Sequence, residues 1–376
     1  MMVSVLLYAY CLGVRSSRQI ERACEMDVAF RVITGNLKPD YSTICRFRSE
    51  NEGKLGRLFT EVLRLCAEAG LVKAGVVALD GTKVKANASK HKAVSYGRAK
   101  EKQRQLREEV KQLLAQAAAA DEEEDRRHGS RRGDELPEEL RRRETRLAKI
   151  KQAKKAIEQR AREKAAAEGK SAAEVKQAKP GEKDQYNFTD PESRIMKSAD
   201  GFVQGYNAQA AVEPGLGLIV GQLVTQAAND KEQLQPMVEA IEQQSGQRPV
   251  AILADSGYCS EENLTYLESV EQPERQIAAY VATGKQKHGE HRQPCPRGPL
   301  PAGATGVDRM RRKLQTKAGK AVYAARKCVV EPVFGQIKQA RGFRQFVLRG
   351  IQKVKGEWAL VCLTHNILRL YAASQA

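Results

Sequence analysis

Three carboxylates of the chain stand next to apolar segments, where an acidic side chain needs a specific reason to be. Asp80 directly follows the apolar run at 76–79, and Asp255 directly follows the apolar run at 249–254. Glu331 is enclosed by apolar residues on both sides. A buried carboxylate needs a compensating partner, and Mg²⁺ binds a few carboxylate oxygens while water and phosphate fill its other positions. Three acids could hold two ions roughly 4 Å apart and so support displacement reactions at phosphorus.

The two aspartates are expected at the ends of buried strands. The runs at 76–79 and 249–254 are short, apolar and partly β-branched, which favours strands, and open α/β sheets place their sites beyond strand ends. A single Asp in such a place is more often a turn residue or a helix cap. Two of them on strands of one sheet are harder to explain as turn residues or caps, and they favour a functional site.

Further strands and a helix complete an α/β pattern around these acids. Alternating or apolar stretches predict strands at 205–212, 216–224 and 278–282. A helix capped by Asn229 or Asp230 should run through Ile241, and residues 308–371 should be helical. Such an order of strands and helices predicts one compact α/β domain.

Residues 1–74 predict an all-α N-terminal domain. Ser16 and Gln19 form a capping-box pattern, and Asp40 should cap a short helix that carries Arg46 and Arg48. Two interpretations stay open. Either this is a helix-turn-helix-like unit whose arginines bind DNA, or it is a helical bundle whose arginines are merely solvated.

Residues 90–184 are rich in Lys, Arg, Glu, Ala and Gln and predict a long, charged helical insertion resembling a coiled-coil hairpin. The chain then divides into the N-terminal domain at 1–74, the α/β domain at 75–89 and 185–376, and the insertion at 90–184.

The charge of the chain favours a polyanionic partner. Lys and Arg number 64 against 46 Asp and Glu, which gives a formal net charge of +18, and nucleic acid is the commonest partner of so basic a protein. No apolar run reaches the roughly 18 residues of a membrane span. Cationic residues gather around Glu331, where they could bind phosphates: Arg326, Lys327, Lys338, Arg341, Arg344.

Five motifs, in this order, resemble the Asp-Asp-Glu transposases of bacterial insertion sequences, in the branch with a ribonuclease-H-like catalytic domain. They are the segments at 77–87, 187–194, 205–209, 254–258 and 330–338, and the segment from Trp358 to Leu368 is similar to the closing helix of that family. The resemblance covers nearly the whole chain.

The resemblance implies that Asp80, Asp255 and Glu331 are the catalytic, metal-binding carboxylates. It also implies a signature of Tyr, Arg, Glu and Lys, in which Lys338 stands seven positions after Glu331 as the family has it. Tyr323 and Arg326 are spaced as expected from each other, but Lys327 occupies the position that the pattern gives to the arginine. Which of the two cations has that role stays open.

The implied activity is metal-dependent cleavage of transposon ends followed by attack of a 3′-hydroxyl on target DNA. The implied cofactor is a pair of Mg²⁺ ions, for which Mn²⁺ is expected to substitute. The implied partners are double-stranded DNA and a second copy of the chain, with no membrane, in the bacterial cytoplasm and at the nucleoid when bound to DNA.

Two alternatives to an active transposase remain. The abrupt start of the sequence motivates the first, a catalytically inactive DNA-binding remnant truncated at its N-terminus, which would bind DNA without cutting it. The second is a nuclease that cuts but does not join. A tyrosine recombinase is disfavoured, because it would need Arg and His residues around the tyrosine rather than three acids.

Overall fold

The computed structural model describes residues 1–72, 75–128, 138–198, 201–268, 276–284, 298–301 and 303–375. The chain forms two compact units, one made of residues 1–87 with 196–376 and the other of residues 88–195. Within the described ranges, no helix is long and apolar enough to cross a membrane.

The first unit begins with five helices: α1 Met2–Cys11, α2 Ser17–Met26, α3 Val28–Thr34, α4 Tyr41–Glu50 and α5 Glu52–Glu68. The predicted cap at Asp40 is confirmed, because its carboxylate accepts from the amides of Ser42 and Thr43. The predicted capping box is wrong, since the Ser16 side chain makes no cap hydrogen bond. The side-chain cap in this region is at Asp27, whose carboxylate accepts from two amides at the start of α3.

A mixed sheet of six strands forms the centre of this unit. Its order is β4-β5-β1-β7-β8, and β6 also pairs with β5. β5 is antiparallel to β1 and to β6, whereas β7 is parallel to β1 and to β8. The strands are β1 Val76–Lys85, β4 Arg194–Ser198, β5 Gly201–Val212, β6 Ile219–Thr225, β7 Ala251–Ala254 and β8 Ala278–Val281. The α/β class is confirmed, with a mixed sheet and many helices.

Strand β1 is longer than its apolar run predicts. It continues past Asp80 to Lys85 because β5 remains paired with it along that whole length. The expectation that a strand ends at Asp80 is therefore wrong, while β7 does end directly before Asp255 as predicted.

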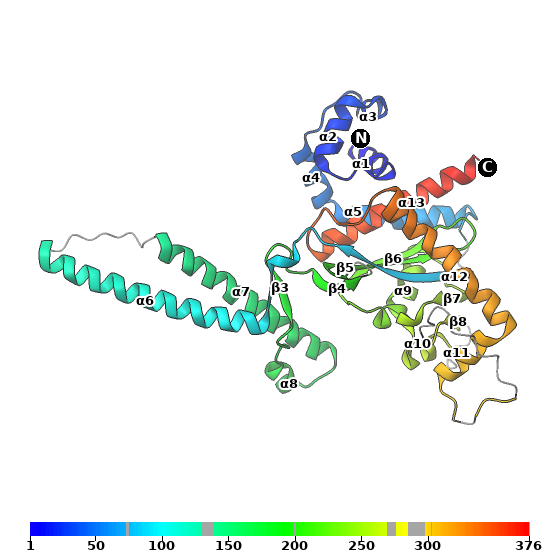
Figure 1. The fold of residues 1–376 in the computed structure, drawn as a ribbon. Helices are drawn as coiled ribbons and strands as arrows, with labels where there is room; N and C mark the ends of the chain where they lie inside the picture. The colour runs from blue at the N-terminus through cyan, green and yellow to red at the C-terminus, as the bar shows by residue number, and fades with distance from the viewer. Residues whose placement is uncertain are drawn as a thin grey trace. The chain divides into compact units, whose positions relative to one another are not determined.

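Helices α5 and α13 pack against each other along this unit, and α13 also packs on β6 (Figure 1). The central part of α13 is fully enclosed, and Trp358 Nε1 donates to the Gln209 carbonyl on β5 at 3.0 Å. The Asn366 side chain accepts from the Ile219 amide and donates to the Ile219 carbonyl, each at 2.8 Å. It thus makes the same pair of hydrogen bonds that a neighbouring strand would make. The helices after the N-terminal group are α9 Leu234–Ser245, α10 Glu261–Leu267, α11 Gly306–Gln315, α12 Lys317–Gly335 and α13 Ile351–Ser374.

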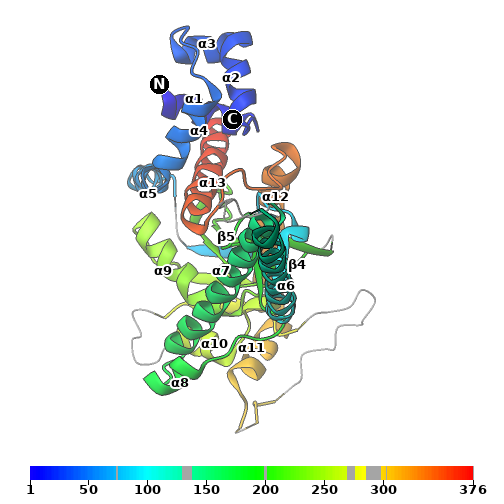
Figure 2. The same ribbon diagram turned by 90° about the vertical axis from the view of Figure 1, so that its left-hand side faces the viewer.

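The second unit is a helical hairpin on a small two-stranded sheet. Helices α6 (Tyr96–His128) and α7 (Glu138–Ala167) lie side by side (Figures 1 and 2). Tyr96 Oη donates to Glu158 at 2.8 Å, which ties the start of α6 to the later part of α7. The remaining elements are β2 Ala93–Ser95, β3 Gln185–Asn187 and α8 Ala172–Gln177, and the small core includes Val94, Ala99, Ile150, Ile157 and Tyr186.

Candidate active site

Asp80 and Asp255 stand opposite each other on two neighbouring parallel strands. The β1–β7 register pairs Ala78 with Leu253, and each aspartate lies two residues further along the chain, Asp80 within β1 and Asp255 directly after β7. Neighbouring strands run about 4.8 Å apart. The sheet therefore brings the two carboxylates together at one edge, as the sequence predicted.

Arg326 of α12 reaches this pair of acids. Its Nη1 lies 3.4 Å from Asp80 Oδ2, and the side chains are only 11% and 23% exposed. Burial raises the pKa of Asp80 to about 6; the charge of Asp255 raises it too, while the Arg326 guanidinium opposes both. Tyr323, one turn earlier on α12, interacts with Arg326, and burial raises the pKa of its phenol.

Asp230 supports the site from the neighbouring layer of side chains, a role that the sequence reasoning missed. Its Oδ1 accepts from Asn207 Nδ2 and Gln209 Nε2, each at 2.6 Å, and from Lys83 Nζ at 3.2 Å. Asn207 and Gln209 are fully buried on β5. Because buried amides need partners, two such residues in a central strand were the signal that pointed to a buried acid nearby.

The same network touches the glycines that follow the two aspartates. A Cβ on Gly81 would lie 2.7 Å from Asp230 Oδ1 and closer still to the Gln209 amide, so only glycine lets these side chains cross the strand. Asp230 Oδ2 would lie 3.5 Å from a Cβ on Gly257. Asp230 thus lies beside both segments that carry the candidate ligands.

Tyr258 lies close enough to the three aspartates of this region for their charges to act on its phenol. It is fully buried and donates from its hydroxyl to Gln209 Oε1. Burial raises the pKa of this phenol well above its usual range, and the charges of Asp230, Asp80 and Asp255 raise it further. It therefore stays protonated and acts as a hydrogen-bond donor.

Glu331 occupies a different position from the two aspartates. It lies on the exposed side of α12, whose buried side carries Val330 and Val333. Among the residues that the structure describes, no group of three His, Cys, Asp or Glu side chains is arranged to hold a metal ion. The strand register therefore brings together two of the three predicted acids, with hard oxygen atoms that suit Mg²⁺, and within the described residues Glu331 does not complete a three-acid metal site with them.

The segment after Glu331 is irregular. Pro332 lies inside the helix, and a π-helical turn follows at Gln336–Ala340. Such turns are frequent at functional sites. Lys338 belongs to this turn, and its Nζ donates to Thr82 Oγ1 and, at 3.4 Å, to the Lys83 carbonyl. Lys338 therefore lies along β1 on the strand segment that follows Asp80.

The other predicted cationic residues fall into two groups. Arg46, Lys327 and Arg344 are exposed. Arg48 is fully buried and donates to Tyr10 Oη at 3.1 Å and to the Arg15 carbonyl at 2.8 Å.

Arg341 is buried in the same way as Arg48. It donates to Thr364 Oγ1 at 2.8 Å and to the Val361 carbonyl at 3.2 Å, and burial lowers its pKa to about 10. The guanidinium groups of Arg48 and Arg341 are thus used inside the protein, and neither is available to a phosphate.

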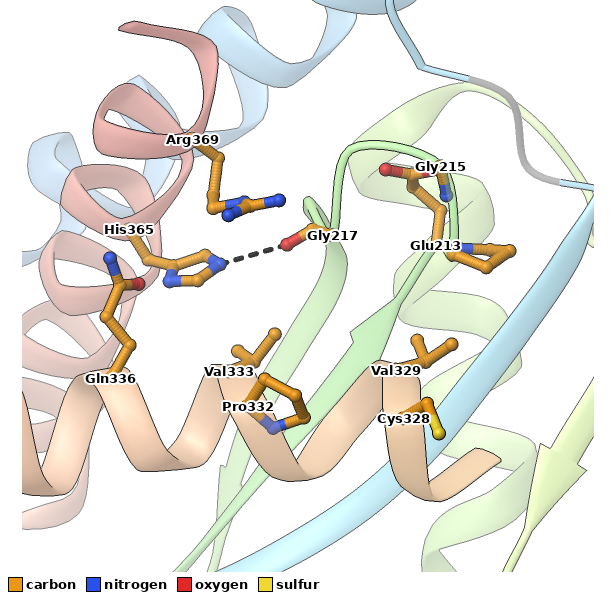
Figure 3. Close-up of a pocket in the computed structure, with 11 residues that line it drawn as sticks. Glu213, Gly215, Gly217, Cys328, Val329, Pro332, Val333, Gln336, His365 and Arg369 are labelled. Carbon is orange, nitrogen blue, oxygen red and sulfur yellow. Dashed lines mark hydrogen bonds between the residues drawn. The ribbon is translucent and has the colours of Figure 1, made fainter. Parts of the chain in front are cut away.

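A cavity of about 260 Å³ lies on another side of α12 (Figure 3). His365 of α13 points toward it, and its Nε2 donates to the Gly217 carbonyl at 2.9 Å. Burial lowers the pKa of His365 to about 4. None of the three predicted acids lines this cavity, so it is separate from the carboxylate site.

Comparison with known protein families gives two matches. A family model described as Transposase DDE domain matches residues 171–367, which are 197 of the 376 residues, and one described as Transposase domain (DUF772) matches residues 1–50. The first match includes Asp255 and Glu331 and begins after Asp80. Searches of curated proteins and of solved structures found no match.

Proposed function

The chain belongs to the DDE transposase family, and from this premise we propose that it cuts the ends of a mobile DNA element and joins them to target DNA. The observation that carries the proposal is the pair of carboxylates at neighbouring strands, Asp80 on β1 and Asp255 directly after β7, with the guanidinium of Arg326 beside Asp80. A transposase acts on DNA, and the net charge of +18 suits such a substrate.

Asp80, Asp255 and Glu331 are the proposed metal ligands. Bound Mg²⁺ would activate the attacking oxygen and stabilise the leaving one. Asp80 and Asp255 are supported by their register on the sheet. Glu331 is supported by its motif and by its place in the matched family domain, and it would have to approach the aspartates from the exposed side of α12.

The proposed DNA contacts come from the exposed cationic residues and from the signature residues beside the acids. Lys327, Arg344 and Arg46 are exposed, while Tyr323, Arg326 and Lys338 lie next to Asp80 or to β1. Phosphate contacts of this kind would supply affinity and position rather than base specificity. Arg48 and Arg341 are left out of this surface, because their guanidinium groups bond inside the protein.

A ribonuclease-H-like fold is proposed for the catalytic part. Its support is the strand order β6-β5-β1-β7-β8, with antiparallel pairing on one side of β1 and parallel pairing on the other. We also propose the domain division at 1–74, at 75–89 with 185–376, and at 90–184, with the last forming a coiled-coil-like insertion. Two copies on DNA would be needed to hold two element ends.

A strand-transfer assay tests the function. Duplex DNA that carries the element's own ends is incubated with the protein and a target plasmid, in Mg²⁺ and in EDTA, for the wild type and for Asp80→Asn. Cutting and joining that require both Mg²⁺ and Asp80 are expected. Cutting without joining would support the nuclease, and binding without cutting in any divalent metal would support the inactive remnant.

A further inference from the structure

The guanidinium of Arg326 lies directly against the carboxylates proposed to bind metal. Its Nη1 is 3.4 Å from Asp80 Oδ2, and its charge also interacts with that of Asp255. The residue is more than nine-tenths buried. A buried positive charge aimed at two acids occupies the same electrostatic position that a bound cation would.

Arg326 is held beside Asp80 by charge and by one long contact, and it also shares a side-chain hydrogen bond with Tyr323. Its Nε and Nη1 atoms have no hydrogen-bond acceptor among the described residues. Charge-assisted bonds of arginine to carboxylate are usually about 2.7–2.9 Å long, so the 3.4 Å separation is a loose one. Moving the guanidinium away from Asp80 therefore gives up one long contact with that carboxylate.

We propose that Arg326 and a divalent cation compete for Asp80 and Asp255, and that the displaced guanidinium then binds a DNA phosphate. This rests on the proposed function, in which both aspartates are metal ligands. A guanidinium and a divalent cation on the same carboxylates would repel each other strongly at such short range. The two cations therefore cannot both keep close contact with the pair.

The competition couples metal binding to DNA binding. A phosphate offers Arg326 another anion, so DNA lowers the cost of moving the guanidinium away from Asp80. Because linkage is reciprocal, DNA should tighten metal binding through Arg326, and metal should tighten DNA binding by the same factor. Arg326 would in this way favour metal loading when a DNA strand is already in place.

Calorimetric titration of the full chain with Mn²⁺ in the absence of DNA tests the proposal, at about pH 8.5 so that the carboxylates are ionised. Removal of the competing charge in Arg326→Gln should tighten Mn²⁺ binding by roughly tenfold or more, a change of about 1.4 kcal/mol. Lys317→Gln is the matched control, because it removes one positive charge from an exposed residue at the start of the same helix, α12. It should change the affinity by less than about twofold.

Two further variants separate the possible failures. Arg326→Met also removes the charge but keeps an apolar stem, so it repeats the test if the glutamine variant does not fold, as thermal unfolding will reveal. Affinity in both neutral variants equal to that of Lys317→Gln, or weaker than in the wild type, would overturn the competition. Asp255→Asn should abolish the Mn²⁺ site. If it does not, the ion binds elsewhere, and the metal site of the proposed function fails together with this inference.

Discussion

The two halves of the proposed site are built by different means. Asp80 and Asp255 are positioned by the hydrogen-bonded register of two strands and by the bonds of Asp230 in the next layer. Glu331 is positioned by a helix that contains Pro332 and passes into a π-helical turn. A strand register fixes which residues stand opposite each other, whereas a π turn changes the rotation of the residues on its two sides.

The sheet half of the site, with Asp80 and Asp255, is more fully organised than the helical half, with Glu331. The sheet half has its acids together and its supporting side chains bonded. In the helical half the acid is exposed, and a cavity adjoins the same helix at Cys328, Pro332 and Gln336 (Figure 3). The sheet half should therefore respond to substitution through stability as well as activity, and the exposed acid of the helical half through activity alone.

The largest expected effect is on Glu331. Glu331→Gln should lower DNA cleavage by about 10³-fold or more, because Glu331 is a proposed ligand of the metal that stabilises charge in the transition state. The free energy of unfolding should change by less than about 0.5 kcal/mol, because the side chain is exposed. Cleavage kinetics and urea unfolding measure the two effects, with the exposed Glu262→Gln as the control. Cleavage within about tenfold of the wild type would remove Glu331 from the site.

The packing behind α12 should depend on pH through His365. Its pKa of about 4 in the folded chain lies below the value near 6.5 of an exposed histidine. The unfolded chain therefore binds the proton first as the pH falls, and about 3 kcal/mol of stability should be lost between pH 6.5 and pH 4. Unfolding in urea across this range measures the loss.

His365→Gln supplies the control for that pH dependence. Its amide can still donate to the Gly217 carbonyl but does not titrate. The variant should lack about 3 kcal/mol of the acid-induced loss, while the contribution of the carboxylates remains. Equal slopes in the wild type and the variant would mean that folding does not change the pKa of His365.

The sheet half should lose stability when the Asp230 network is cut. Asp230→Asn leaves Lys83 without its acid, and both side chains are less than one-fifth exposed. We expect the free energy of unfolding to fall by about 2–3 kcal/mol. This is near the lower end of the losses seen when a buried ion pair is broken, because solvent reaches part of the Lys83–Asp230 pair. Lys83→Met should cost a similar amount, and the double variant less than the sum of the two. Strictly additive losses would mean that the pair is not coupled.

The smallest expected effect concerns Lys338, which joins the two halves by bonding to Thr82 and Lys83. Lys338→Met should weaken DNA binding and reduce the slope of log affinity against log salt by about 0.9, the value for one phosphate contact. Binding measured over a range of salt concentrations tests this. An unchanged slope would confine Lys338 to its contacts with β1.

The sequence predicted the sheet half better than the helical half. Apolar runs before Asp80 and Asp255 identified two central strands, and strand pairing then brought the acids together. The end of β1 was predicted wrongly, because its last residues are polar and are kept in the sheet by β5 rather than by their own burial. The sequence predicts a cap at Asn229 or Asp230, but the Asp230 side chain makes no cap hydrogen bond and bonds to the buried amides of β5 instead.

The roles of individual arginines could not be read from charge. Arg48 lies one turn after Ile44, and both are fully buried, so the apolar face of α4 includes an arginine. Arg46, two residues earlier, is on the exposed side of the same helix. Arg48 can be buried because Tyr10 and Ser17, which are far away in sequence, accept hydrogen bonds from its guanidinium.

The most direct test of the central claim, that Asp80 and Asp255 bind the same catalytic metal, is a change in metal preference. Asp80→Cys and Asp255→Cys replace a hard oxygen ligand by a softer thiolate, which disfavours Mg²⁺ and favours softer ions. Both variants should lose DNA cleavage in Mg²⁺ and regain a measurable part of it in Mn²⁺ or Zn²⁺, while Ser256→Cys keeps the preference of the wild type. Cleavage in Mg²⁺ by either variant, or no recovery in any softer metal, would contradict the account.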